Sequence, residues 1–290
     1  MMLRKKLTQG EFAVLVELNI PKGVDISELV THVRHLKSRI DAVVIPDMDG
    51  GVMRMSALGG GAVIRREGFE PVIHIYGRDR NRMAIQGDVL AAQALGIQNL
   101  IVVQGDAMAN SDHPAAKTVD DLNELDLLSM VQSLQKGLDL AGFDLKGKPA
   151  FFTGCQVQPI RDDKHLSEEY EKAKEKVAAG AQFIVVPPVF DIPAYTQILN
   201  KLKSLKVPVI ATVFMLKNVG MARYISINDP GSGLSDELIG RIRKAKDREM
   251  ECVHIAAEMI QSLKGVAQGV KISAVGWEDR LPAILDCAGL

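Results

Sequence analysis

Several apolar runs in this sequence end abruptly in polar side chains that could carry out chemistry. The run LIVV, from residue 100, is followed by Gln104, Gly105 and Asp106, and the run AVLV, from residue 13, ends at Glu17. A carboxyl group beside apolar residues is partly desolvated, and desolvation raises its pKa. A raised pKa suits a general acid near neutral pH, so the sequence predicts that role for Glu17. The alternative is that Glu17 pairs with a basic residue inside the fold.

Other apolar runs are followed by polar residues in the same way. Taken singly, such residues have simpler explanations: a Gly-Asp pair can form a turn, and a lysine among Glu and Lys at helical spacing is usually solvated. Cys155 is a candidate nucleophile only if a histidine base lies near it. The further candidates are Asn19, Asp47, Asp49, His74, Tyr76, Arg78, Asp79, Thr153, Gln156 and Gln158.

Eight short runs rich in β-branched residues are the strands that would position these side chains. The first four begin at residues 13, 41, 70 and 99, so they start 28, 29 and 29 residues apart, which is the length of one strand and one helix. Helical patterns fill the gaps. The eight runs are AVLVELNI from 13, DAVVIP from 41, EPVIHIYG from 70, NLIVVQGD from 99, PAFFTGCQ from 149, FIVVPPVF from 183, VPVIATVF from 207 and GVKISAVG from 269.

This alternation predicts an α/β fold, a single (β/α)8 TIM barrel domain over residues 1–290. An open doubly wound sheet is the alternative, but the fingerprint G-x-G-x-x-G is missing after the first run, which ends in NIPKG. The triple glycine 59–61 falls inside a helical pattern, which favours tight helix packing over a phosphate loop. Active sites of (β/α)8 barrels lie at the carboxyl ends of the strands, so the polar run ends are expected to meet there.

Composition excludes several classes of partner. The 35 Lys and Arg residues balance 36 Asp and Glu residues, and a net charge of −1 gives no broad basic field for nucleic acid. Three cysteines without a CxxC pair argue against a disulfide framework and a self-contained zinc site, so we expect no metal and a reducing cytoplasm. No signal peptide is predicted, and no apolar run approaches the length of a membrane span.

A resemblance to a known family is clearest in residues 52 to 106, which read VMRMSALGGGAVIRREGFEPVIHIYGRDRNRMAIQGDVLAAQALGIQNLIVVQGD. Its RMSAL, HIYGRDRN and ALGIQN motifs resemble the methylenetetrahydrofolate reductase family, in which the second motif reads H-L-T-C-R-D-R-N. Further matches are VELNIP, KVAAGAQFIVVPPVFD from 176 and GVKISAVGWEDR from 269. The resemblance spans nearly the whole chain, and it is closest to the short forms without a regulatory domain, as in acetogens.

The resemblance implies a barrel that binds a flavin, FAD or FMN, and reduces 5,10-methylenetetrahydrofolate to 5-methyltetrahydrofolate. In this interpretation Glu17 is the general acid, and Asp106 lies near the flavin and the pterin. Lys174 matches a basic residue near the flavin phosphate, and Phe214 joins Glu17 and Asp106 in binding the substrate. The implied cofactor-binding residues are Asp47, His74, Arg78, Gln104, Gly105, Asp106, Gln156, Gln158 and Lys174.

The chain departs from the family pattern at three places. Gln104 replaces an arginine, the stretch from Gly154 to Pro159 replaces Tyr-Pro-Glu-x-His-Pro, and Val186-Pro187 replaces a Thr-Gln whose glutamine contacts folate and nicotinamide. The resemblance to short homologues implies an oligomer, a small cysteine-rich zinc protein as a partner, and an electron-transfer partner. Two alternatives use the same barrel: a folate- or corrinoid-linked methyltransferase component, and a non-redox subunit of a larger complex.

Overall fold

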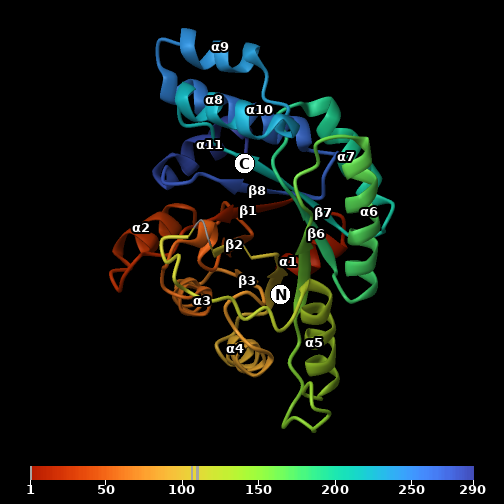
Figure 1. The fold of residues 1–290 in the computed structure, drawn as a ribbon. Coiled ribbons are helices and arrows are strands. Elements are labelled where there is room, and N and C mark those ends of the chain that lie inside the picture. The colour runs from red at the N-terminus through yellow and green to blue at the C-terminus, as the bar shows by residue number, and fades with distance from the viewer. Residues whose placement is uncertain (1, 106, 109–110) are drawn as a thin grey trace.

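The strands of the protein close into one parallel barrel. A computed structural model describes residues 2–105, 107–108 and 111–290. Each strand pairs with the next along the chain, and the last pairs with the first, so the predicted (β/α)8 barrel is confirmed (Figure 1). The strands are β1 (Ala13–Glu17), β2 (Ala42–Ile45), β3 (Pro71–Ile75), β4 (Asn99–Val102), β5 (Phe152–Gln156), β6 (Phe183–Val186), β7 (Val209–Phe214) and β8 (Gly269–Ser273).

Helices surround this ring of strands, and side-chain caps fix where many of them begin (Figure 1). Asn123 and Asp126 form a capping box at the start of α5, and Gly137 ends that helix in the left-handed conformation. The helices are α1 (Met2–Thr8), α2 (Ser27–His35), α3 (Ala57–Arg66), α4 (Arg82–Ala94), α5 (Glu124–Lys136), α6 (Asp163–Ala178), α7 (Ile192–Lys203), α8 (Val219–Asn228), α9 (Asp236–Lys244), α10 (Arg248–Leu263) and α11 (Leu281–Ala288), with short 3-10 helices η1 (Asp49–Gly51), η3 (Pro230–Ser232) and η4 (Glu278–Arg280).

The triple glycine lies inside α3, where it lets the helix approach the barrel closely. A Cβ atom at Gly60 would lie 2.3 Å from Cγ2 of Ile20, and one at Gly61 would lie 2.7 Å from Cδ1 of Ile97. Both neighbours are fully buried and have no room to move. The helix-packing interpretation of this segment is therefore confirmed.

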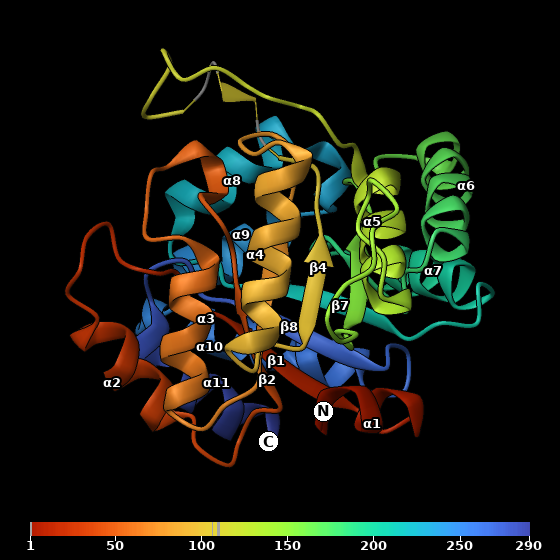
Figure 2. The same ribbon diagram turned by 90° about the horizontal axis from the view of Figure 1, so that it is seen from below.

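The lower part of the barrel is a packed apolar core. Because side chains alternate along a strand, every second residue points into the barrel. Helix α1 covers the amino end, where it contributes Leu3 and Leu7 to the same cluster, and it lies opposite the segment that follows β4 (Figure 2). The strand residues of this interior cluster include Ala13, Leu15, Ala42, Val44, Val72, Ile101, Phe152, Phe183, Val185 and Ile210. The carboxyl ends of the strands are therefore the part of the barrel where polar side chains gather above this core.

A pair of aromatic rings fills the centre of this core. The ring centroids of Phe152 and Phe183 are 4.8 Å apart, and both side chains are buried. Gly154, two residues further along β5, leaves the space that the Phe183 ring occupies. A Cβ atom at Gly154 would lie 2.3 Å from Cε2 of that ring.

We expect Gly154→Ala to lower the free energy of unfolding by about 1–3 kcal/mol, because the enclosed ring of Phe183 must move. Gly87→Ala in α4 is the matched control. A Cβ atom there meets nothing within 4 Å, so removing a helical glycine should raise stability by about 0.5–1 kcal/mol. Urea denaturation followed by circular dichroism measures both changes. A Gly154→Ala protein as stable as its parent would contradict this account of the core.

Candidate active site at the mouth of the barrel

A layer of polar side chains lies on top of the apolar core. Glu17 ends β1, and its carboxylate contacts two residues of the neighbouring strand β8. Its Oε2 lies 2.5 Å from Nζ of Lys271, and its Oε1 accepts a hydrogen bond of 2.7 Å from the hydroxyl of Ser273. The side chains of Glu17 and Lys271 are only 14% and 8% exposed. Sequence reasoning missed this partner, although the two-residue period of β8 places Lys271 on the inner face.

The electrostatic environment of Glu17 is the opposite of the one that sequence analysis predicted. Burial is the largest single influence and acts to raise its pKa, as expected. The charge and hydrogen bond of Lys271, together with the Ser273 hydroxyl, outweigh burial and hold the pKa of Glu17 below its usual value. The prediction of a raised pKa is therefore wrong, and the alternative, pairing with a basic residue inside the barrel, is confirmed.

His74 faces the same polar layer from β3. Burial and the positive charge of Lys271 lower its pKa to about 4, while Glu17 opposes the shift. The imidazole is therefore neutral at physiological pH. Its Nε2 is buried and has no hydrogen-bond partner among the residues that the structure describes. A buried polar atom of this kind costs free energy unless a ligand or water satisfies it, which makes His74 a candidate ligand contact.

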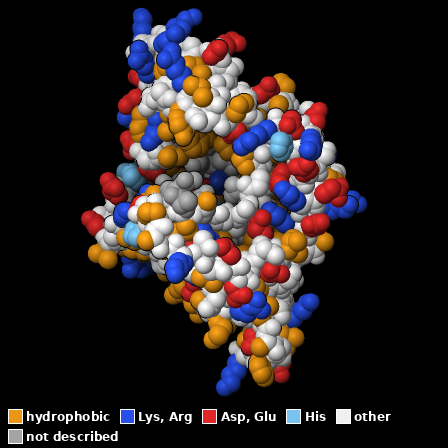
Figure 3. All heavy atoms as spheres, viewed as in Figure 1, with side chains coloured by type: hydrophobic (Ala, Val, Ile, Leu, Met, Phe, Trp, Pro, Cys, Tyr) orange, Lys and Arg blue, Asp and Glu red, His pale blue; other side chains and the backbone are white. Residues whose placement is uncertain are grey.

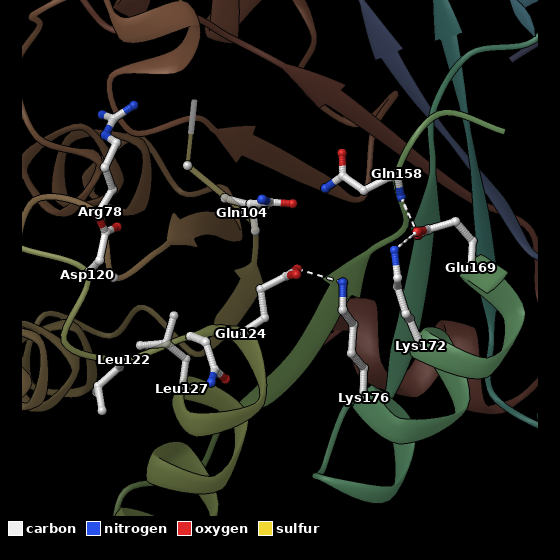
Figure 4. A pocket seen from close by; sticks show the side chains of 14 residues that line it. Arg78, Gln104, Asp120, Leu122, Glu124, Leu127, Gln158, Glu169, Lys172 and Lys176 are labelled. Carbon is white, nitrogen blue, oxygen red and sulfur yellow. Dashed lines mark hydrogen bonds and ion pairs between the residues drawn. The ribbon is translucent and has the colours of Figure 1, made fainter. Parts of the chain in front are cut away.

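A cavity of about 410 Å3 opens beside the mouth, next to the carboxyl ends of β4 and β5. Four of the predicted cofactor-binding residues line it: Arg78, Gln104, Gly105 and Gln158. The first turn of α5 and one face of α6 supply the opposite wall, as Figure 4 shows. The structure thus brings together residues from four separate regions of the sequence, 77–78, 103–105, 120–127 and 158–176.

Two ion pairs organise the wall of this cavity (Figure 4). Lys176 Nζ lies 2.6 Å from Oε1 of Glu124 and 2.9 Å from the carbonyl oxygen of Gln156. Glu169 accepts hydrogen bonds of 2.8 Å from Lys172 Nζ and from the backbone N–H of Gln158. Because Lys172 and Lys176 are four residues apart, they share one face of α6.

Lys174, which the resemblance places near the flavin phosphate, lies outside this cavity. Its side chain is 61% exposed and its Nζ pairs with Glu171 at 3.1 Å. It is two residues from both Lys172 and Lys176, and such residues point to different faces of a helix. The helical period was the signal that could have selected Lys172 and Lys176 instead.

Arg78 and Asp47 hold the framework of the site. The Arg78 guanidinium lies 4.6 Å from the ring centroid of Tyr76 and binds Asp79 through two nitrogens, at 2.7 and 2.8 Å. Asp47 is buried, and its two oxygens accept from the backbone N–H of Ala57 and from Arg80. Asp47 therefore anchors the start of α3, and it does not line the cavity that holds Gln104.

The remaining predicted residues fall at different places. Gln156 ends β5 at the mouth, and Phe214 ends β7 half-buried on the inner face, beyond Thr212. Asp106 lies outside the described residues. Cys155 points away from the barrel interior into the apolar layer beneath the helices, where burial raises the pKa of its thiol to about 12, so it does not have the properties of a nucleophile.

Viewed from the carboxyl ends of the strands, the molecule is hollowed at its centre (Figure 3). Within residues 2–105, 107–108 and 111–290, no group of three or more His, Cys, Asp or Glu side chains could hold a metal ion. The helices of the same ranges include none that is long and apolar enough to cross a membrane.

Eight parallel strands, a packed interior and a polar mouth define a protein of the (β/α)8 barrel class, with its candidate site where barrel enzymes have theirs. The family model for methylenetetrahydrofolate reductase matches residues 2–289. The chain therefore belongs to the methylenetetrahydrofolate reductase family, and the resemblance inferred from its motifs is confirmed.

Individual relatives are distant. Methylenetetrahydrofolate reductase 2 of Schizosaccharomyces pombe is 22% identical over 237 residues, which are 75% of this chain and 35% of that protein, so the chain spans about a third of its length. An uncharacterised protein from Clostridium thermocellum that binds two copies of 5-methyl-5,6,7,8-tetrahydrofolic acid has a TM-score of 0.69, 14% identity and coverage of 99% and 98% of the two chains. The EDTA monooxygenase EmoA of Chelativorans sp. BNC1 has a TM-score of 0.60, 10% identity and coverage of 96% and 92%. These two structures share the fold.

We expect His74 to make the protein less stable in acid. The unfolded chain takes up a proton on this imidazole near pH 6.5, whereas the folded protein does so only near pH 4. Protons therefore bind preferentially to the unfolded state between about pH 6.5 and pH 4, and the free energy of unfolding falls by up to about 3 kcal/mol across this range. His74→Phe should remove that part of the pH dependence, as urea titrations from about pH 7 to about pH 4.5 would reveal. If the free energy of unfolding depended on pH in the same way in both proteins, the buried, neutral state assigned to His74 would be contradicted.

Proposed function

We propose that this protein is a flavin-dependent reductase that converts 5,10-methylenetetrahydrofolate to 5-methyltetrahydrofolate. The observation that carries the proposal is the buried Glu17 at the mouth of the barrel, in a chain that the family model matches over residues 2–289. Two further facts support it: a curated relative is named as such a reductase, and a protein of the same fold binds 5-methyltetrahydrofolate.

The residues at the mouth fit a flavin. The buried Nε2 of His74 has no partner among the described residues, and it lies on the strand next to β4, whose end carries Gln104 and Gly105. The cavity beside them offers the side-chain amides of Gln104 and Gln158 and the half-exposed ammonium group of Lys172. Amides suit the polar edge of a flavin ring, and an ammonium group suits a phosphate. His74, Gln104, Gly105, Gln158 and Lys172 are therefore the residues that would hold the cofactor.

A reduced flavin supplies a hydride, and the protein must prepare the carbon that receives it. The methylene bridge of the substrate has to open to an iminium cation, which requires a proton at the nitrogen that leaves. Glu17 is a carboxyl group of the mouth that could pass this proton on, and Phe214 at the end of β7 would pack against the pterin. The apolar layer beneath, which includes Leu15 and Ile210, excludes water from the amino end of the barrel. The cation would therefore be protected from hydrolysis on that side.

We expect Glu17→Gln to lower the rate of folate reduction by at least about 100-fold. The amide keeps the shape of the side chain but cannot pass on a proton. Reduction of the bound flavin by an artificial donor should stay within about threefold of the parent, because that step needs no acid. Stopped-flow absorbance of the flavin measures both half-reactions separately, and circular dichroism checks that the variant is folded. Equal losses in the two half-reactions would remove Glu17 from the proposed role.

We expect Lys172→Ala to weaken flavin binding by about 5–10-fold, because an ammonium group beside the phosphate is lost. Lys174→Ala is the matched control, since it removes the same charge from the same helix but outside the cavity. Fluorescence titration of the flavin-free protein gives both dissociation constants. Equal weakening in the two variants would mean that the helix acts through its net charge and not through the cavity.

A further inference from the structure

The pairing of Glu17 with Lys271 leaves the origin of the reaction's proton unexplained. Lys271 and Ser273 occupy both oxygens of the Glu17 carboxylate, and the pair is buried. A carboxylate in this state is ionised and has no proton to give. The substrate nevertheless has to be protonated before its methylene bridge opens. A proton source outside the carboxyl group would remove this conflict, an inference that rests on the proposed function.

The charges that surround the pair are few. Among the described residues, the strand interiors at this level present Glu17 from β1, His74 from β3, Gln156 from β5, Thr212 from β7, and Lys271 with Ser273 from β8. At this level the inner faces of β2, β4 and β6 carry the apolar residues Val44, Ile101 and Val185. His74 is neutral, so the charged groups that the described residues contribute to this layer are the ammonium group of Lys271 and the carboxylate of Glu17.

We propose that Lys271 supplies, through Glu17, the proton that opens the methylene bridge of the substrate. The Nζ–H bond of Lys271 breaks as the proton moves to Oε2 of Glu17, at 2.5 Å. The carboxyl group then gives a proton to the leaving nitrogen, which keeps the electron pair of the broken carbon–nitrogen bond. The products of this step are a neutral lysine, an ionised Glu17 and the substrate iminium cation. Water later returns a proton to the lysine.

Charge conservation is the physical reason for this assignment. An iminium cation that forms near a permanent ammonium group in a buried site is strongly disfavoured by electrostatic repulsion. If the lysine gives up the proton, one positive charge moves from Lys271 to the substrate, and the carboxylate stabilises it in both places. The net charge of the layer does not change. The Ser273 hydroxyl keeps Oε1 in place, so Oε2 is the oxygen that exchanges protons.

The competing role for Lys271 is that of a permanent counter-ion, and Lys271→Arg separates the two. Arginine keeps the positive charge but does not release its proton in proteins. Our proposal predicts that Lys271→Arg slows the folate half-reaction by at least about 100-fold from about pH 6 to about pH 9, where Glu17 is ionised. A counter-ion role predicts a rate within about threefold of the parent. Flavin affinity and the rate of flavin reduction by an artificial donor serve as checks on folding.

Lys271→Met and the pH profile of the parent decide the question even if the arginine variant does not fold. An ammonium group ordinarily holds its proton to a much higher pH than a carboxyl group. The parent should therefore keep a constant folate half-reaction rate from about pH 6 to about pH 9. In Lys271→Met the proton must come from Glu17 itself, so the rate should fall about tenfold per pH unit above the pKa of that carboxyl group. Identical pH profiles for the two proteins would overturn the proposal.

A second readout does not need the cofactor. Infrared spectra of the flavin-free protein distinguish an ionised from a protonated Glu17, with Glu17→Gln as the blank. We expect Glu17 to be ionised at neutral pH in the parent and in Lys271→Arg. In Lys271→Met the charge that outweighs burial is gone, so Glu17 should become protonated at a higher pH. An unchanged protonation midpoint in Lys271→Met would overturn the proposal. A parent protein that binds flavin but does not turn over the folate would instead remove the proposed function.

Discussion

The buried ion pair between Glu17 and Lys271 is the interaction on which the rest of the site depends. Removing either partner would leave a charge in a layer that the protein shields from water, which commonly costs several kcal/mol. The pair joins β1 to β8, the first and the last strands of the barrel. The same contact therefore contributes to closing the barrel and sets the protonation state of the candidate acid.

Strand register makes this contact possible. In the β1–β8 ladder, Leu15 lies opposite Lys271 and Glu17 lies opposite Ser273. Lys271 therefore lies two residues before Ser273 on the inner face of β8, and its side chain extends up to the carboxylate of Glu17. Ser273 lies directly beside that carboxylate. Beneath them, Phe152 and Phe183 fill the barrel and keep water away from the pair. A shift of one residue in this register would turn every one of these side chains to the outer face.

The sequence predicted the fold well because the fold depends on periodic patterns. Buried strands read as continuous apolar runs at regular spacing, and their carboxyl ends must meet in a closed barrel. The position of Glu17 followed from the same argument. Its pKa did not, because the value depends on Lys271, which is 254 residues away and becomes a neighbour only when the barrel closes. The residues next to Glu17 in the sequence indicate that its carboxyl group is desolvated. They do not reveal the charge of Lys271, which outweighs the effect of desolvation on the pKa.

Lys174 lies outside the cavity for a reason that the motif does not show. A motif match compares positions along the sequence and does not consider which face of a helix each residue occupies. Two residues that are two positions apart in a helix point to different faces. Lys172 and Lys176 line the cavity because each is held there by a carboxylate, Glu169 and Glu124 respectively. These ion pairs hold the lysines in place, so less conformational entropy would be lost on binding the phosphate of the proposed flavin. The same carboxylates compete with that phosphate for the ammonium groups. An anion that binds in this cavity would therefore have to fit between the two ion pairs. The pair of Glu17 and Lys271 at the mouth is separate from them.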